Sequence, residues 1–193
     1  MYALVESGTI TKYFNHPKGF TLGDLQYPAD IFTKWSTEEK QAIGIHEIVF
    51  DNSNKKDEKW YINTNQSFAF ADGTVTASYG TATPKAHADV IESVNGVELT
   101  TPGLKTNLIR DLKVNVANEL ARTDWYITRN VEKSTAIPSN ISTHRDAVRT
   151  KQASIEAQIT GAADTAALET LHTYTTTDGV QSRPLGELPV LES

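Results

Sequence analysis

The sequence predicts an α+β protein, with an N-terminal antiparallel β meander that includes one short helix, a C-terminal α-helical hairpin or bundle, and an extended tail. Apolar and polar side chains alternate with a period of two in residues 1–83, which is typical of strands. In residues 84–174 apolar side chains recur every three or four positions, as they do on one face of a helix. Residues 175–193 hold prolines and glycines without a period. We therefore expect a β-rich domain, a helical domain and an extended C-terminal arm over these three ranges.

Two hairpins are predicted in the β-rich domain, each around a two-residue turn. Ser7-Gly8 separates two β-prone runs, and Asp72-Gly73 is a pair that type I′ turns prefer, because both central residues need positive φ. The side chains expected opposite each other are Val5 and Ile10, Tyr2 and Tyr13, Phe70 and Val75, and Phe68 and Ala77. The last two pairs form one apolar side, so we expect one buried and one solvated face.

A short helix is predicted between these hairpins. Ser36 would cap it, Glu39 would complete a capping box, and Gly44 is placed to end it. Residues 45–50 and 59–64 have the composition of two further strands, which a polar loop would join.

Apolar stripes predict the main helices of the second domain. A short helix over residues 86–96 comes first, and a longer one begins near Pro102, whose missing N–H costs nothing there. The stripe of the longer helix consists of Leu104, Leu108, Leu112, Val116 and Leu120. A long helix over residues 139–160 carries a second stripe, Ile141, His144, Val148, Ile155 and Ile159. The last helix would be capped by Asp164 and place Leu168 and Leu171 on one face.

Residues 123–133 predict one more helix, with Thr123 as its cap. We expect Trp125 and Tyr126 to anchor it against its neighbours, because large rings carry much of a small core's burial. An aromatic ligand platform is the alternative role for this pair. A strand is the alternative to the helix, since Trp-Tyr-Ile-Thr is β-prone.

The composition limits the classes of partner. The chain has 193 residues, no cysteine and a formal charge of −6 without a basic stripe, so disulfides are excluded and no nucleic-acid partner is expected. No apolar run approaches the roughly 20 residues that cross a bilayer, so we expect no membrane partner. The first residues lack the basic flank and apolar stretch of a signal peptide, which indicates synthesis in a cytoplasm.

Three candidate chemistries are weak. His144-Arg145-Asp146 matches the triplet of the kinase catalytic loop, but Lys151 stands where that loop has Asn, and the Asp-Phe-Gly and Gly-rich motifs are absent from the sequence. We expect Arg145, Asp146 and Arg149 near the surface of a helix instead. Residues 51–62 begin like a calcium loop but place lysines among the ligand positions. The five histidines lack the spacing of a zinc motif.

We therefore expect no catalytic, cofactor-binding or metal-binding residue, and no enzyme. A small enzyme whose site is assembled from scattered residues stays open as the alternative. The tail is a better candidate for function, because its prolines and glycines prevent a helix that could bury its apolar side chains. The expected partner-binding residues are Val180, Leu185, Leu188, Val190 and Leu191.

Part of the helical domain resembles the C-terminal motif of small bacteriophage tail proteins, which include tail-fibre assembly chaperones. The residues that carry the resemblance are Asp124-Trp125, Arg129, Glu132, Ile137-Pro138, Arg145 and Arg149. The family usually has an aromatic residue before the first arginine of the second helix, where this chain has His144. The N-terminal half resembles small virion-associated proteins of marine phages in Tyr2 to Val5, Leu22 to Asp24, Tyr27-Pro28, Trp35-Ser36 and Ser67 to Ala77.

The resemblance implies a tail-associated protein that binds other proteins. Its partners would be tail fibre, baseplate or tail tube components, with self-association as a further option. The protein would be made in the host cytoplasm and remain in the virion tail. The alternative within the same family is an assembly chaperone that is not retained in the virion.

Overall fold

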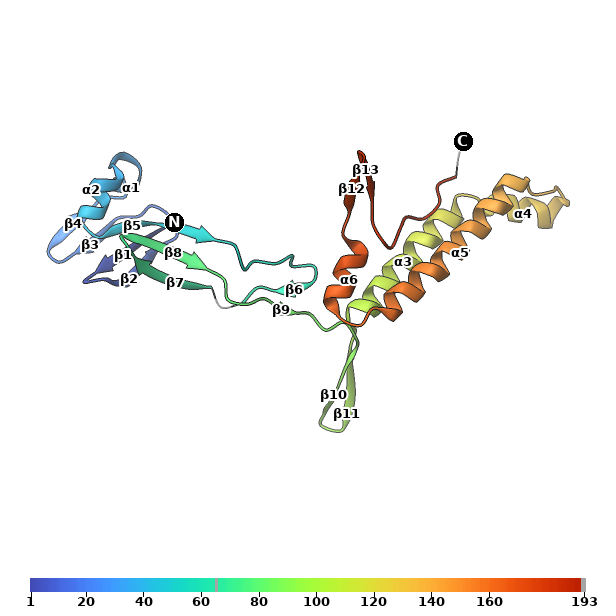
Figure 1. The fold of residues 1–193 in the computed structure, drawn as a ribbon, viewed down its shortest axis with the longest axis horizontal. Helices are drawn as coiled ribbons and strands as arrows, with labels where there is room; N and C mark the ends of the chain where they lie inside the picture. The colour runs from blue at the N-terminus through green and yellow to red at the C-terminus, as the bar shows by residue number, and fades with distance from the viewer. Residues whose placement is uncertain (65, 192–193) are drawn as a thin grey trace. The chain divides into compact units, whose positions relative to one another are not determined.

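The computed structural model of the protein describes residues 1–64 and 66–191. It is a mixed α+β fold with strands in the N-terminal part and helices in the C-terminal part, as predicted at this level (Figure 1). The chain divides into an N-terminal unit, Met1–Thr83, and a C-terminal unit, Pro84–Ser193.

A five-stranded sheet in the order β2-β1-β5-β8-β7 forms the centre of the N-terminal unit. Its strands are β1 (Tyr2–Glu6), β2 (Thr9–Phe14), β5 (Ile45–Asp51), β7 (Ser67–Ala71) and β8 (Thr74–Ser78). The sheet is mixed, because β5 and β8 pair in parallel with Ile48 opposite Val75. The prediction of an antiparallel meander is wrong at this pair, since a period of two indicates the face of each side chain but not the direction of the next strand.

The register of the second hairpin is confirmed, with Phe70 opposite Val75 and Phe68 opposite Ala77. In the first hairpin Val5 lies opposite Ile10 as predicted, but Tyr2 lies opposite Phe14 instead of Tyr13. The register shifts between Leu4 and Val5, which inserts one extra residue into β2 as a β-bulge does. A bulge of this kind leaves no signal in the alternation of the sequence.

Both faces of the sheet bury apolar side chains. One core consists of Leu4, Phe14, Phe20, Ile31, Phe32 and Ile45, and the other of Ala3, Val5, Ile48, Val75 and Ala77. The first is built with β3 (Phe20–Leu22), β4 (Leu25–Tyr27) and α1 (Ile31–Lys34). The edge strands β2 and β7 approach each other, because the ring centroids of Tyr13 and Phe68 lie 4.8 Å apart. The sheet is therefore strongly curled.

The short helix α2 (Thr37–Ala42) has the predicted capping box. The Glu39 N–H donates to Ser36 Oγ at 3.2 Å, and the Ser36 N–H donates to Glu39 Oε2 at 2.8 Å. Gly44 follows the helix at φ +80°. The strand predicted over residues 59–64 shrinks to β6 (Tyr61–Ile62), which pairs with β9 (Thr83–Pro84) and not with β5.

In its described residues, 84–191, the C-terminal unit contains four helices and two small hairpins. The helices are α3 (Leu104–Ala121), α4 (Asp124–Lys133), α5 (Ser139–Gly161) and α6 (Thr165–His172). Helices α3 and α5 lie side by side (Figure 1). The five side chains of the stripe predicted for α5 are all buried, whereas on α3 Leu112 and Val116 are buried and the rest of the stripe is half-buried. Asp164 caps α6 as predicted, accepting from the Ala167 N–H at 2.8 Å.

The helix predicted over residues 86–96 is wrong. Residues 90–101 form a hairpin of β10 (Val90–Val94) and β11 (Val97–Thr101) around Asn95-Gly96. Valine and isoleucine favour strands, and both residues of the turn have positive φ, as a type I′ turn requires.

The tail is not extended throughout. Strands β12 (Thr175–Thr177) and β13 (Val180–Ser182) form a hairpin around Asp178-Gly179. Beyond it the Leu185 N–H donates to the carbonyl oxygen of Leu171 at 3.1 Å, which ties the segment to the end of α6.

Candidate protein-binding surfaces

Arg145 joins three helices at the end of the C-terminal unit that holds α4. Its Nη1 donates to the carbonyl oxygen of Leu120 at 2.8 Å and to Thr123 Oγ1 at 2.7 Å, and it lies 2.8 Å from Asp124 Oδ1. The last carbonyls of α3 have no partner within the helix, and a cation at this end also suits the helix dipole. We name this arrangement the elbow.

The predicted surface position of Arg145 is wrong, because the residue is only 8% exposed. The spacing of the stripe placed it beside the buried face but could not show that a helix end would cover it. Asp146 and Arg149 are exposed as predicted and pair weakly with each other at 3.5 Å. Thr123 does not cap α4 with its side chain, since its hydroxyl donates to the carbonyl oxygen of Leu120 instead.

His144 forms a second link between α5 and α3. Its Nε2 lies 3.0 Å from Glu119 Oε1, and the imidazole is almost fully buried. Arg122 Nη1 donates to the same carboxylate at 3.0 Å. His144 stands where the tail-protein motif has an aromatic residue, and here it contributes a polar contact across the helix pair.

The outer side of α4 presents aromatic rings to solvent. Trp125 is 51% exposed, and its ring centroid lies 3.7 Å from that of Tyr126. The Arg129 guanidinium lies over both rings, 4.8 Å and 5.4 Å from their centroids. Among the described residues, Arg129 Nε is buried without a hydrogen-bond partner. We name these three side chains the α4 patch.

The prediction that Trp125 is a core anchor is therefore wrong. Helix α4 contributes no buried side chain at all among the described residues. Composition predicted that a large ring would be buried, but burial needs a facing element, and α3 ends before it could supply one. Trp, Tyr and Arg are also the residues enriched in interface hot spots, so the same composition suits a binding surface.

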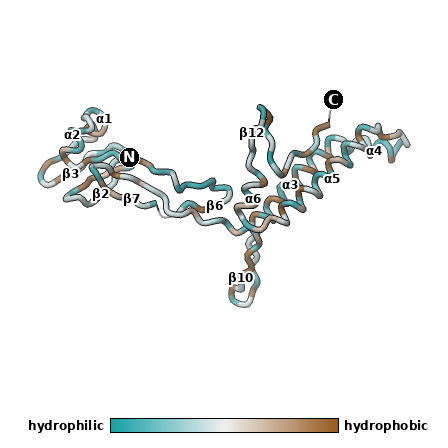
Figure 2. The backbone as a smooth tube through the Cα atoms, in the orientation of Figure 1, coloured by the Kyte–Doolittle hydropathy of each residue, from teal (hydrophilic) through white to brown (hydrophobic). Residues whose placement is uncertain are grey.

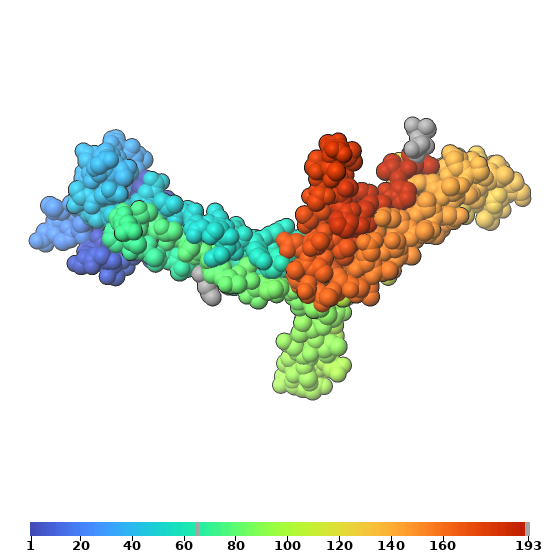
Figure 3. Space-filling view, viewed as in Figure 1, coloured from blue at the N-terminus to red at the C-terminus, as the bar shows by residue number. Residues whose placement is uncertain are grey.

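The hairpin of β10 and β11 is a second exposed surface, in a segment for which a helix was expected. Every residue of both strands is exposed, and both strands hold hydrophobic residues (Figure 2). We name this hairpin the arm, because it projects away from α3 and α5 (Figures 1 and 3). The detectable signal was Asn95-Gly96 between β-branched residues.

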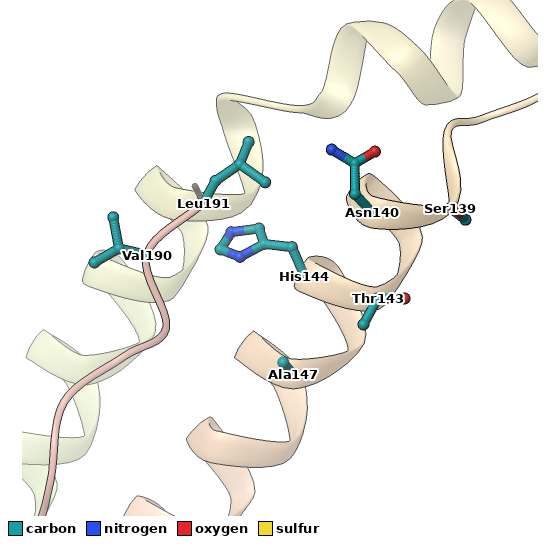
Figure 4. Close-up of a pocket in the computed structure, with 7 residues that line it drawn as sticks. All are labelled: Ser139, Asn140, Thr143, His144, Ala147, Val190 and Leu191. Atoms are coloured by element: carbon teal, nitrogen blue, oxygen red, sulfur yellow. The ribbon is translucent and has the colours of Figure 1, made fainter. Parts of the chain in front are cut away.

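The tail lies partly on its own chain. Val190 and Leu191 line a shallow pocket of about 380 Å³ with residues from the first turns of α5 (Figure 4). Those residues are Ser139, Asn140, Thr143, His144 and Ala147. The pocket is mainly polar on the α5 side and apolar on the tail side. Among its described lining residues, no pair of ionisable groups is placed for proton transfer.

The five predicted partner-binding residues of the tail do not share one surface. Val180 and Val190 are 66% and 75% exposed, whereas Leu188 and Leu191 are half-buried. Leu185 is 4% exposed and is therefore covered by its own chain. Its position after Pro184 turns it inward, where it packs near the end of α6.

Metal and acid–base chemistry receive little support from the described residues. Within residues 1–64 and 66–191, no group of three or more His, Asp or Glu side chains is arranged to hold a metal ion. Local hydrogen bonds lower the pKa of Glu38, Asp51 and Asp89. A hydrogen bond to Glu187 raises the pKa of Tyr174. These four groups belong to separate segments.

No protein-family model, no curated protein and no solved structure matches this chain. In the part of the chain that the structure describes, no helix is both long and apolar enough to cross a membrane. The surfaces that distinguish the molecule are the α4 patch, the arm and the exposed part of the tail.

Proposed function

We propose that this protein is a bacteriophage tail-associated structural protein, which attaches to or assembles tail fibre or baseplate components through protein–protein contacts. The observation that carries the proposal is that residues of the motif resembling tail proteins have two different structural roles. The buried Arg145 pairs with Asp124 and holds the elbow, whereas Trp125 is half exposed with the Arg129 guanidinium over its ring.

This arrangement supports binding because the pair of Asp124 and Arg145 holds the start of the helix that carries Trp125 and Arg129. A rigid aromatic surface loses little conformational entropy when a partner covers it. The α4 patch combines a cation with two adjacent aromatic rings, a composition typical of interface hot spots. Its partner would supply an acceptor group or an apolar pocket in another tail component.

The proposal also covers the helix pair of α3 and α5 and the exposed end of the tail. Helices α3 and α5 would act as a helical hairpin that neighbouring tail chains complete into a bundle. The exposed end of the tail, with Val190, would lie extended along a neighbouring component. Ordering such a segment costs about 1–2 kcal/mol per residue in backbone entropy, so burial on a partner would have to offset it.

The experiment is to replace Trp125 in the phage and to quantify the chain in purified virions. We expect Trp125→Ala to leave the folded chain in the cell but to lower its stoichiometry in virions. Val131→Ala is the matched control, since Val131 is also an exposed apolar residue of α4, at 79%. Equal incorporation of both variants would contradict the role of the α4 patch.

The same measurement separates the two tail roles. A structural component is present in virions at a fixed ratio to other tail proteins. An assembly chaperone is missing from virions while its loss still reduces the number of assembled fibres. A chain missing from virions whose deletion has no effect on assembly would overturn both roles.

A further inference from the structure

The arm is fixed to the start of α3 by hydrogen bonds. The Gly103 N–H donates to Asp89 Oδ1 at 2.8 Å, and the N–H groups of Leu104 and Lys105 donate to the carbonyl oxygens of Ala86 and His87 at 3.0 Å. These N–H groups belong to the helix start, where they have no partner within the helix. Asp89, which precedes the arm, and Gly103, which follows it, are therefore held together at the start of α3.

The backbones at this base are closely packed. A Cβ on Gly103 would lie 2.2 Å from the carbonyl oxygen of Ala88, so the two backbones touch. This packing and the hydrogen bonds hold the arm in a direction away from its own α3 (Figure 1).

One face of the arm is apolar with a single acid at its centre. Opposite residues of an antiparallel pair share a face, which here places Val94 beside Val97 and Glu92 beside Leu99, with Val90 beside Thr101 at the base. The exposed fractions of Val94, Val97 and Leu99 are 51%, 68% and 56%. The other face is mainly polar and carries Ile91, Ser93, Glu98 and Thr100. A two-stranded hairpin with an apolar face is marginal in water without a covering element.

Helix α3 offers a surface of the matching kind. Outside the stripe that packs on α5, it has a shallow hollow of about 610 Å³ that is lined mainly by apolar and basic side chains. The residues of this hollow are Thr106, Ile109, Arg110, Lys113, Val114 and Ala117. Val114 is 54% exposed, and the Arg110 side chain is 65% exposed. We name this surface the α3 groove.

We infer that the arm of one copy of this chain docks in the α3 groove of a second copy. The apolar side chains of the arm would cover Ile109 and Val114, while Glu92 would meet Arg110 and Lys113. The lengths also agree, since five residues of a strand span about 13 Å. The helix from Thr106 to Ala117 rises by about 16 Å.

The contact is heterologous, because the arm and the groove are different surfaces. Each copy therefore offers one arm and one groove, and the copies close into a ring or continue as a chain. The inference does not rest on the tail role, since both surfaces belong to this chain and can be tested on the purified protein alone.

The test is sedimentation of the full chain over a concentration series. We expect the unmodified chain to self-associate, and Leu99→Lys on the arm or Val114→Glu in the groove to weaken association about tenfold or more, as loss of a central contact does. Ile91→Lys is the control, because it places the same charge on the other face of the arm at a residue that is 64% exposed. Far-UV circular dichroism verifies that each variant is folded.

A mixture of the two variants tests the geometry itself. An equal mixture of Leu99→Lys and Val114→Glu contains one intact arm and one intact groove, so we expect a dimer that grows no further. The reversal Glu92→Arg should weaken association alone and recover it when combined with Arg110→Glu. The inference is overturned if the unmodified chain stays monomeric, if Ile91→Lys weakens association as much as Leu99→Lys, or if the mixture stays monomeric.

Discussion

Arg145 Nη1 and Asp124 Oδ1 lie 2.8 Å apart, so a residue in the second turn of α5 holds the first residue of α4. Asp124 is directly followed by Trp125, and the orientation of the α4 patch therefore depends on this pair. The Arg145 side chain is 9% exposed and that of Asp124 is 59% exposed. Arg145 is consequently the buried member of the pair, and it also donates a hydrogen bond to a carbonyl oxygen at the end of α3.

Arg145→Ala is expected to destabilise the C-terminal unit by about 2–3 kcal/mol, because it removes charge-assisted hydrogen bonds to the Leu120 carbonyl, the Thr123 hydroxyl and the Asp124 carboxylate. Arg145→Lys should recover only part of this loss, since an ammonium cannot reproduce the guanidinium fork. Arg149→Ala is the control on the same helix and should change stability by less than about 0.5 kcal/mol. Urea unfolding followed by circular dichroism measures all three. Equal effects at both positions would contradict the role assigned to Arg145.

Trp125→Ala is expected to change the free energy of unfolding by less than about 1 kcal/mol, because the ring is half exposed and has no facing element. Leu168→Ala provides the comparison, since Leu168 is fully buried in the same unit and its truncation should cost about 2–5 kcal/mol. Thermal and urea unfolding distinguish the two. A loss at Trp125 as large as that at Leu168 would mean that α4 folds onto the core.

Acid is expected to loosen the base of the arm through Asp89. Hydrogen bonds from the Thr106 hydroxyl and the Gly103 N–H lower the pKa of this carboxyl below its ordinary value. Since the folded pKa is lower than the unfolded one, the stabilisation is fully present above the unfolded pKa of about 3.9. It is lost as the pH falls through the folded pKa.

Nuclear magnetic resonance can follow this transition through the amide of Gly103. In the unmodified chain its chemical shift should move below about pH 4, as the carboxylate that accepts its hydrogen bond becomes protonated. In Asp89→Asn the same amide should show no acid transition. An unchanged transition in that variant would assign the titration to another carboxyl.

Gly44→Ala and Gly8→Ala form a matched pair in the N-terminal unit. Both glycines have φ +80°, so an alanine at either site incurs the left-handed backbone cost of about 1–2 kcal/mol. A Cβ at Gly44 would also lie 2.4 Å from the carbonyl oxygen of Val5, whereas nothing lies within 4 Å at Gly8. We expect Gly44→Ala to be clearly the more destabilising change in urea unfolding. Equal losses would show that β1 can shift away from Gly44 at little cost.

Local signals in the sequence predicted local structure well. The Asp72-Gly73 turn, the capping box of Ser36 and Glu39, and the Asp164 cap each depend on residues within a few positions, and the structure confirms them. The stripe of α5 was equally readable, because a helix brings residues three or four apart onto one face.

Features that depend on distant partners could not be predicted in the same way. The parallel pairing of β5 with β8, the burial of Arg145 and the exposure of Trp125 are each decided by which element lies opposite. The arm was missed for a different reason, because a short helix and a short hairpin share the apolar content of residues 86–101 and only the turn residues distinguish them. For the candidate surfaces, the sequence supplied the residue types while the structure supplied their direction.

The parallel pair of β5 and β8 also has a consequence for the order of folding. A parallel pair cannot be closed by a tight turn, so the segment between Asp51 and Thr74 must form a loop before Ile48 meets Val75. The chain loses the conformational entropy of this loop before the contact can stabilise it, and non-local pairing therefore slows folding. Each helix and hairpin of the C-terminal unit forms from local contacts, although the packing of α3 on α5 also joins distant residues such as Lys105 and Thr160.

We therefore expect the N-terminal unit to fold more slowly than the C-terminal unit, although it is synthesised first. Stopped-flow refolding of a Trp125→Phe chain would follow the N-terminal unit alone, through Trp35 and Trp60. Its fluorescence phase should lag behind the helical signal at 222 nm in circular dichroism. Simultaneous phases would show that the two units fold as one cooperative system. A lag would mean that, in a newly made chain, β5 is still unpaired with β8 after the helices have formed.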